Sequence, residues 1–172
     1  MLFRSHVRKW IGCEELCLRN SHSQVESLWV KIKDQSSKGH SVVGVCYRPS
    51  DHQEAVDEAF LLQLQEVSHL WALVLMGDFN NPDICWDSGM VGGRQYRRFL
   101  ESIENNFLVQ VIDGPTQGEA LLDLVLTNEE ESIREVKIGG SLGCSDHALV
   151  EYVILKNEGL AKSRARPCVL GE

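Results

Sequence analysis

The strongest constraint on the fold of this chain is a short apolar run, 71–76, that is followed directly by Gly77-Asp-Phe-Asn80. Every position of the run is apolar, which predicts a strand that is buried on both faces. Gly77 is expected to end this strand. Polar groups at the carboxyl end of such a strand lie where open α/β sheets usually hold their sites. The run therefore predicts an α/β domain with a candidate site at Asp78 and Asn80.

Hydrophobic periodicity on either side of this strand predicts two helices and several short strands. Apolar residues recur at helical spacing over 54–68 and 94–107. Apolar and polar residues alternate at the end of 25–33, and the turn-forming stretch that follows predicts a hairpin with a strand at 41–47. Two long helices among about six strands are typical of a layered α/β domain. The remaining strands are expected at 123–127, 133–138 and 148–155.

Composition and charge exclude several classes of protein. The chain carries 25 acidic and 17 basic side chains, a formal net charge of −8, which argues against a protein that coats nucleic acid by bulk charge. The longest uncharged apolar run, 70–77, is far shorter than the ~20 residues of a membrane helix, so we expect no membrane partner. The length predicts one domain, placed at 1–155, and a disordered basic tail at 156–172.

The six cysteines are scattered and do not form the paired spacings of a disulfide framework or of a zinc site. We therefore expect reduced thiols, which are typical of proteins in reducing compartments. This predicts an intracellular protein of the nucleus or the cytoplasm.

Two short polar segments are candidates for chemistry. Asp78 and Asn80 stand two residues apart, so in extended chain they can face one ligand together, although the same residues also suit a plain turn. Ser145-Asp146-His147 precedes the last expected strand. An Asp beside a His can supply a metal ligand and a proton-handling group from one turn, but this segment also suits a strand-entry turn with an exposed His.

Two further residues are unusual in their sequence context. Asp123 has apolar neighbours on both sides. A buried carboxylate is costly unless it is paired, so we expect it to hydrogen-bond a partner, for which His147 is the natural choice. Tyr47 closes an expected strand, and its hydroxyl can donate to a phosphate oxygen or its ring can simply cover the core.

Several common catalytic motifs are missing from the sequence. It has no phosphate-binding glycine loop, no dinucleotide-binding glycine pattern, no His-Glu-x-x-His and no Gly-x-Ser-x-Gly. The remaining carboxylates, amide and imidazole suit metal-assisted activation of water better than covalent catalysis.

The order of these residues resembles the exonuclease–endonuclease–phosphatase superfamily, which includes the apurinic-site endonucleases and DNase I. The chain is more closely similar to the endonuclease domain of LINE-type non-LTR retrotransposons, especially the chicken-repeat clade. The similarity runs from about Trp10 to about Val153, and its motifs are 77–86, 121–128 and 143–150. It implies that the chain is the carboxyl-terminal part of a four-layer, DNase I-like α/β sandwich.

The resemblance also implies roles for the candidate residues. Asp78 would orient or deprotonate the attacking water, and Asn80 would hold the phosphate in the transition state. His147, paired with Asp123, would bind the scissile phosphate. The reaction of the family is Mg²⁺-dependent hydrolysis of a phosphodiester in DNA, which makes Mg²⁺ the expected cofactor and DNA the expected partner. The other implied roles are a metal ligand for Asp146, a phosphate ligand for Tyr47 and hydrogen-bond support for Thr116 and Ser145.

One feature of the family has no counterpart in this sequence. Family members begin with a segment that carries an early Asn and the Glu that is the principal metal ligand; Glu14 and Glu15 fall after its place and do not take this role. We therefore expect a truncated endonuclease domain with impaired activity. Two alternatives stay open. The first is a non-catalytic interaction fragment, and the second is a phosphatase of the same superfamily, against which the motif at 78–86 argues.

Overall fold

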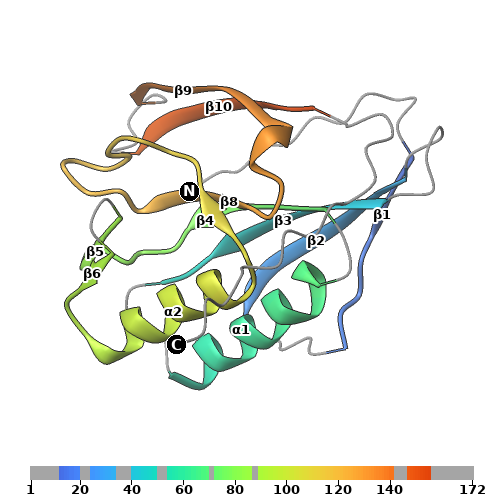
Figure 1. Cartoon of the computed structure of the whole chain (residues 1–172), viewed down its shortest axis with the longest axis horizontal. Helices are drawn as coiled ribbons and strands as arrows, with labels where there is room; N and C mark the ends of the chain where they lie inside the picture. The colour runs from blue at the N-terminus through green and yellow to red at the C-terminus, as the bar shows by residue number, and fades with distance from the viewer. Residues whose placement is uncertain are drawn as a thin grey trace, which may run out of the picture.

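The computed structural model describes residues 12–19, 24–33, 40–49, 54–69, 72–86, 89–141 and 147–155. Within this part of the chain, a six-stranded sheet forms the centre of the molecule (Figure 1). Its strands β3 and β4 are parallel, and all other neighbours are antiparallel. In spatial order the strands are β1 (Gly12–Glu15), β2 (Glu26–Lys33), β3 (His40–Tyr47), β4 (Ala72–Asp78), β8 (Asp123–Thr127) and β7 (Val109–Gln110).

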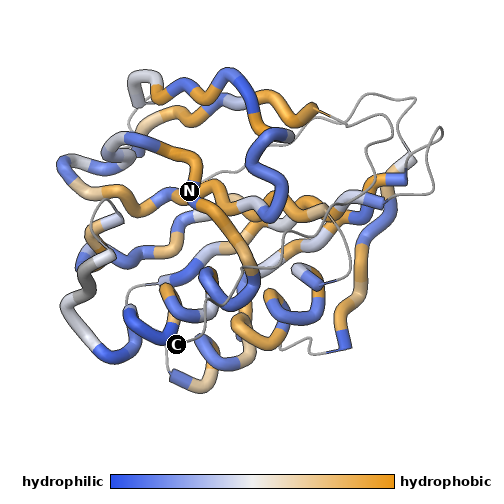
Figure 2. Tube along the Cα trace, in the orientation of Figure 1, coloured by the Kyte–Doolittle hydropathy of each residue, from blue (hydrophilic) through white to orange (hydrophobic). Residues whose placement is uncertain are grey.

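Two further layers cover this sheet. Helices α1 (Glu54–Ser68) and α2 (Arg94–Asn105) lie below it in Figure 1, and the antiparallel pair β9 (Ile133–Ser141) and β10 (Ala148–Ile154) lies above it. Both helices alternate between hydrophobic and hydrophilic stretches in Figure 2, as amphipathic helices do. The layered α/β prediction is confirmed. The smaller elements are β5 (Ile84–Cys85), β6 (Met90–Val91) and the 3-10 turn η1 (Glu130–Ser132).

Strand β4 is buried on both faces, as its sequence predicts. Leu73 and Leu75 belong to the larger hydrophobic cluster, which also contains Leu64 of α1. Val74 points the other way, into a second cluster that contains Ile133 of β9. Because successive side chains of a strand alternate between its faces, an apolar residue at every position binds β4 to both layers at once.

The prediction that Gly77 ends this strand is wrong, because β4 continues through Gly77 to Asp78. Gly77 pairs with Cys46 of β3 and permits a close approach of the two backbones. A Cβ at position 77 would lie 1.9 Å from the carbonyl oxygen of Cys46. Glycine at this position therefore lets β4 stay paired with β3 up to the carboxylate that follows it.

The other expected helices and strands are present, with small differences at their ends. The second helix ends at Asn105 and not at position 107, because Phe107 takes the left-handed backbone conformation with φ 56°. Strand β9 extends to Ser141, beyond the expected 138. The sequence did not predict β1, β5, β6 or β7, which have two to four residues each and are too short to show a period.

Two further findings concern the described residues. Neither of their helices is long and apolar enough to cross a membrane. The cysteines among them, Cys13, Cys17, Cys46 and Cys85, are all free. The intracellular location stays a prediction.

Candidate active site

Two buried carboxylates face each other where β4 ends and β8 begins. Asp78 is the last residue of β4, Asp123 is the first residue of β8, and the register of the two strands pairs them directly. Their exposed fractions are 4% and 5%. Burial removes water from both groups and their charges repel each other, so the pair favours a proton, a donor or a cation close by.

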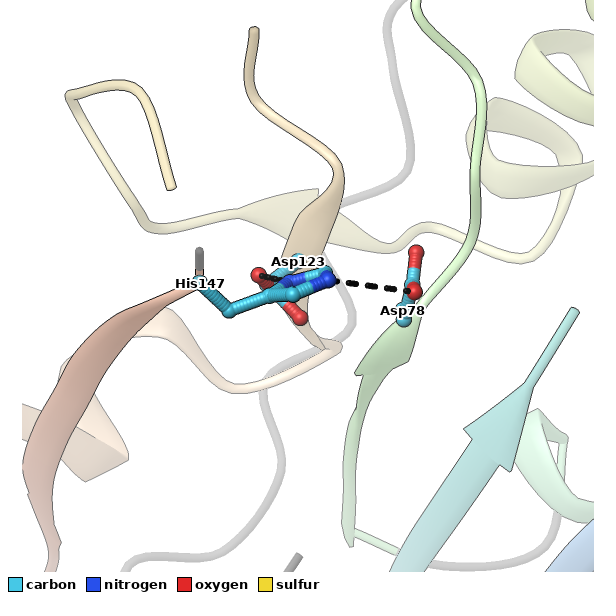
Figure 3. A group of neighbouring side chains, drawn as sticks. All are labelled: Asp78, Asp123 and His147. Carbon is cyan, nitrogen blue, oxygen red and sulfur yellow. Dashed lines mark hydrogen bonds and ion pairs between the residues drawn. The ribbon is translucent and has the colours of Figure 1, made fainter. Parts of the chain in front are cut away.

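His147, the residue just before β10, supplies a donor to this pair (Figure 3). Its Nδ1 lies 2.9 Å from Oδ2 of Asp123. Because an ionised carboxylate only accepts hydrogen bonds, Nδ1 carries the proton and donates it. The hydrogen bond predicted between Asp123 and His147 is therefore confirmed. This bond orients the ring so that Nε2 lies 4.0 Å from Oδ2 of Asp78.

The side-chain oxygen and nitrogen atoms of these three residues are suitable ligands for a divalent cation. One ligand atom from each of Asp78, Asp123 and His147 lies within 4.8 Å of the others. The second carboxylate oxygen of Asp123, Oδ1, is buried and has no hydrogen-bond partner within the described part of the chain. A buried oxygen of this kind normally has a partner, and carboxylate oxygens are the ligands that hard divalent cations prefer.

The pKa of Asp78 is raised above its usual value. Burial is the largest cause and the negative charge of Asp123 is the next. The charge of His147 and a hydrogen bond from the backbone N–H of Asn80 act in the opposite direction. A carboxylate with a raised pKa is a stronger base than an exposed one, which suits proton transfer from water.

Asn80 lies in the turn that follows β4. Its backbone N–H donates to Oδ1 of Asp78 at 3.1 Å, and its φ is 50°, in the left-handed region that Asn tolerates better than most residues. The plain-turn interpretation of this segment is thus correct for its backbone. It does not compete with a functional role, because the same turn fixes the Asp78 carboxylate.

Thr116 connects the start of β8, which carries Asp123, to the start of β10, which directly follows His147. It is buried, and its Oγ1 accepts hydrogen bonds from the backbone N–H groups of Leu122 at 3.1 Å and Asp123 at 2.9 Å. Its carbonyl accepts a hydrogen bond from the N–H of Ala148 at 2.6 Å. Thr116 therefore sets how close the starts of β8 and β10 lie to each other.

The remaining predicted site residues divide into two groups. Tyr47 is the last residue of β3, is paired in register with Asp78 and is 38% exposed, so it stands at the same edge of the sheet. Ser145 and Asp146 lie outside the described residues.

Two buried residues beside the site are not predicted from the sequence. Arg48 is 7% exposed, and its Nη1 donates to the backbone carbonyls of Phe79 and Asn80. Asn81 is 2% exposed, and neither polar atom of its side chain has a hydrogen-bond partner within the described residues. Nothing local in the sequence distinguishes this Arg from an exposed one, whereas Asn81 looks like an ordinary turn residue before Pro82.

The fold and the site define a DNase I-like domain of the exonuclease–endonuclease–phosphatase superfamily. A family model described as endonuclease-reverse transcriptase matches residues 41–151, which include Tyr47, Asp78, Asp123 and His147. The chain belongs to this endonuclease–reverse transcriptase family. The resemblance to the endonucleases of this superfamily that was inferred from the sequence is thereby confirmed. A search of the curated proteins finds no match.

Three solved structures share the fold. The endonuclease domain of TRAS1, a telomere-specific non-LTR retrotransposon, is 15% identical with a TM-score of 0.68, over 88% of this chain and 72% of that one. The 3′ phosphatase NExo from Neisseria, bound to a product DNA hairpin, is 14% identical with a TM-score of 0.54, over 87% and 72%. The human Nocturnin catalytic domain is 13% identical with a TM-score of 0.51, over 84% and 58%.

Proposed function

We propose that this chain is an endonuclease domain of a LINE-type non-LTR retrotransposon protein of the chicken-repeat clade, and that it hydrolyses DNA phosphodiesters with Mg²⁺. The observation that carries the proposal is the cluster of Asp78, Asp123 and His147 at the carboxyl end of β4. The family to which the chain belongs and the fold of the chain support the same proposal.

Each residue of the cluster has a distinct task in this proposal. Asp78, whose pKa is raised, accepts a proton from the water that attacks phosphorus. In its charged form, His147 donates from Nε2 to a phosphate oxygen while Nδ1 stays bonded to Asp123. Asn80 and Tyr47 are assigned to the phosphate, while Thr116 and Ser145 are assigned to supporting hydrogen bonds.

Mg²⁺ would be held by Oδ1 of Asp123, which lacks another partner in the described residues, and by Asp146, the residue before His147 in the sequence. When bound, the ion supplies positive charge that offsets the phosphate and favours ionisation of water. We expect a low rate, because no residue in this sequence takes the part of the principal Glu ligand of the family. Removing one main electrostatic element of such a site commonly costs about 10²-fold or more in rate.

The test is nicking of supercoiled plasmid with enzyme in excess, in Mg²⁺ and again in EDTA. We expect slow nicking that needs Mg²⁺ and that falls at least tenfold further in Asp78→Asn and His147→Ala. Matched controls are Asp113→Asn and His69→Ala, which change exposed residues of the same types. If the parent chain and the Asp78→Asn/His147→Ala double variant behave alike, the non-catalytic interpretation is correct. Fast nicking by the parent would contradict the expected impairment alone.

A further inference from the structure

Arg48 connects helix α1 to the turn that carries the site residues. Its Nε and Nη2 donate to the two carboxylate oxygens of Asp57 in α1, at 2.9 and 3.1 Å. Its Nη1 donates to the carbonyls of Phe79 at 3.1 Å and Asn80 at 3.3 Å. Its backbone N–H donates to the carbonyl of Asp78 at 2.9 Å. One side chain and its backbone thus contact three successive residues of the turn.

These contacts argue against the usual role of an arginine beside a nuclease site. Such a residue normally presents its planar fork to a phosphate. The fork of Arg48 is bidentate on Asp57 instead, and the residue is only 7% exposed. The guanidinium therefore serves the protein itself, with Asp57 fixing its orientation and Nη1 facing the turn.

The turn after β4 is a segment that needs external support. Asn80 has a φ of 50°, an uncommon conformation for a residue other than glycine, and the next residue, Asn81, buries an amide without partners among the described residues. Conformations of this kind persist only when the surrounding structure holds them. Charge-assisted donors on two successive carbonyls supply such a hold.

We propose that Arg48, oriented by Asp57, is a positioning residue that fixes the turn 78–80, so that Asp78 faces His147 and Asn80 is held ready for the phosphate. The consequence for activity rests on the function proposed above. The consequence for the conformation of the turn does not rest on that function. It can be measured even if the chain has no nuclease activity.

The main variant is Arg48→Met/Asp57→Leu, because replacing both members of a largely buried ion pair by apolar residues is often neutral for stability, whereas removing one partner is not. Arg48→Lys is the second variant, since it keeps the charge but loses the fork, and it keeps the test open if the double variant does not fold. The matched control is Arg98→Lys, because Arg98 also bridges carboxylates of α1, Glu54 and Glu58, at the surface. Val67→Ala, which truncates a buried side chain of α1, controls for lost stability alone.

The first measurement is plasmid nicking under conditions where urea titration shows every variant to be folded. We expect kcat to fall at least tenfold in both Arg48 variants, with the DNA concentration for half-saturation within about twofold of the parent. Arg98→Lys and Val67→Ala should keep the parental kcat. Parental kcat in both Arg48 variants would overturn the proposal.

The second measurement is amide hydrogen exchange of Asn80, whose N–H donates to Asp78. Exchange should accelerate at least tenfold in both Arg48 variants and stay unchanged at Leu124, in the middle of the sheet. Unchanged exchange at Asn80 would overturn the positioning role. A parent chain that does not nick counts against the proposed function instead, so the two failures are distinguishable.

Discussion

Asp78 and Asp123 are directly opposite each other in the β4–β8 ladder, and both are almost completely buried. Like charges at opposed positions of an antiparallel pair destabilise a sheet, and burial adds to that cost. The arrangement is therefore poor for stability and useful for chemistry. Buried carboxylates with a raised pKa, such as Asp78, cluster at functional sites.

The first prediction concerns the pH dependence of stability. Burial and Asp123 raise the pKa of Asp78 above its ordinary 3.8, so the folded protein binds this proton more tightly than the unfolded chain does. Its contribution to stability is therefore greatest at low pH and falls as the pH rises from 3.8 through the raised pKa. Asp78→Asn removes this loss. We expect the variant to be more stable than the parent at pH 7, with the gain disappearing near pH 3.

Urea unfolding at a series of pH values measures this difference. Asp113→Asn, at an exposed position, should give no pH-dependent gain. A gain for Asp78→Asn that is the same at pH 3 and pH 7 would show that the buried charge is not its cause.

The second prediction concerns the proton on His147. The hydrogen bond to Asp123 places it on Nδ1 when the ring is neutral. Asp123→Ala removes the acceptor, so the neutral ring should change to a mixture of tautomers. The ¹⁵N chemical shifts of the two ring nitrogens distinguish these states. The exposed His69 should keep its shifts in the variant, and an unchanged His147 would disprove the interpretation of this contact.

The features of the fold and site that can be predicted from the sequence are those that depend on residues close together along the chain. Helix α1 follows from local periodicity and strand β4 from an unbroken apolar run, and Asp123 stands out because its neighbours in sequence are apolar. The role of Arg48 could not be predicted, because its partners are Asp57, 9 residues away, and Phe79, 31 residues away. Residues that create a site are visible locally, whereas those that hold it in place become visible only in the fold.

The third prediction concerns Thr116. Thr116→Val keeps the shape of the side chain but removes the oxygen that accepts hydrogen bonds from the N–H groups of Leu122 and Asp123. Leaving a buried donor without a partner costs about 1–3 kcal/mol. We expect a loss of stability in that range by urea unfolding, and a lower nicking rate because Asp123 is no longer fixed. Thr116→Ser retains the oxygen, so it should recover most of the stability and most of the nicking rate. If Thr116→Val and Thr116→Ser behave alike, the hydroxyl has no such role.

The fourth prediction concerns Asn81, whose amide is buried without a hydrogen-bond partner in the described residues. A buried polar group in this state costs roughly 1–3 kcal/mol, and Leu has the same branched side chain with apolar atoms in place of the amide. Asn81→Leu should therefore raise the free energy of unfolding by about 1 kcal/mol or more. The matched control is Asn106→Leu, because Asn106 is also buried, but it accepts a hydrogen bond from Ser68 and donates one to the carbonyl of Ser102. That variant should be destabilised, since it removes both of these hydrogen bonds. Urea unfolding of the two variants gives opposite signs if hydrogen bonding decides the outcome, and a destabilised Asn81→Leu would contradict the prediction.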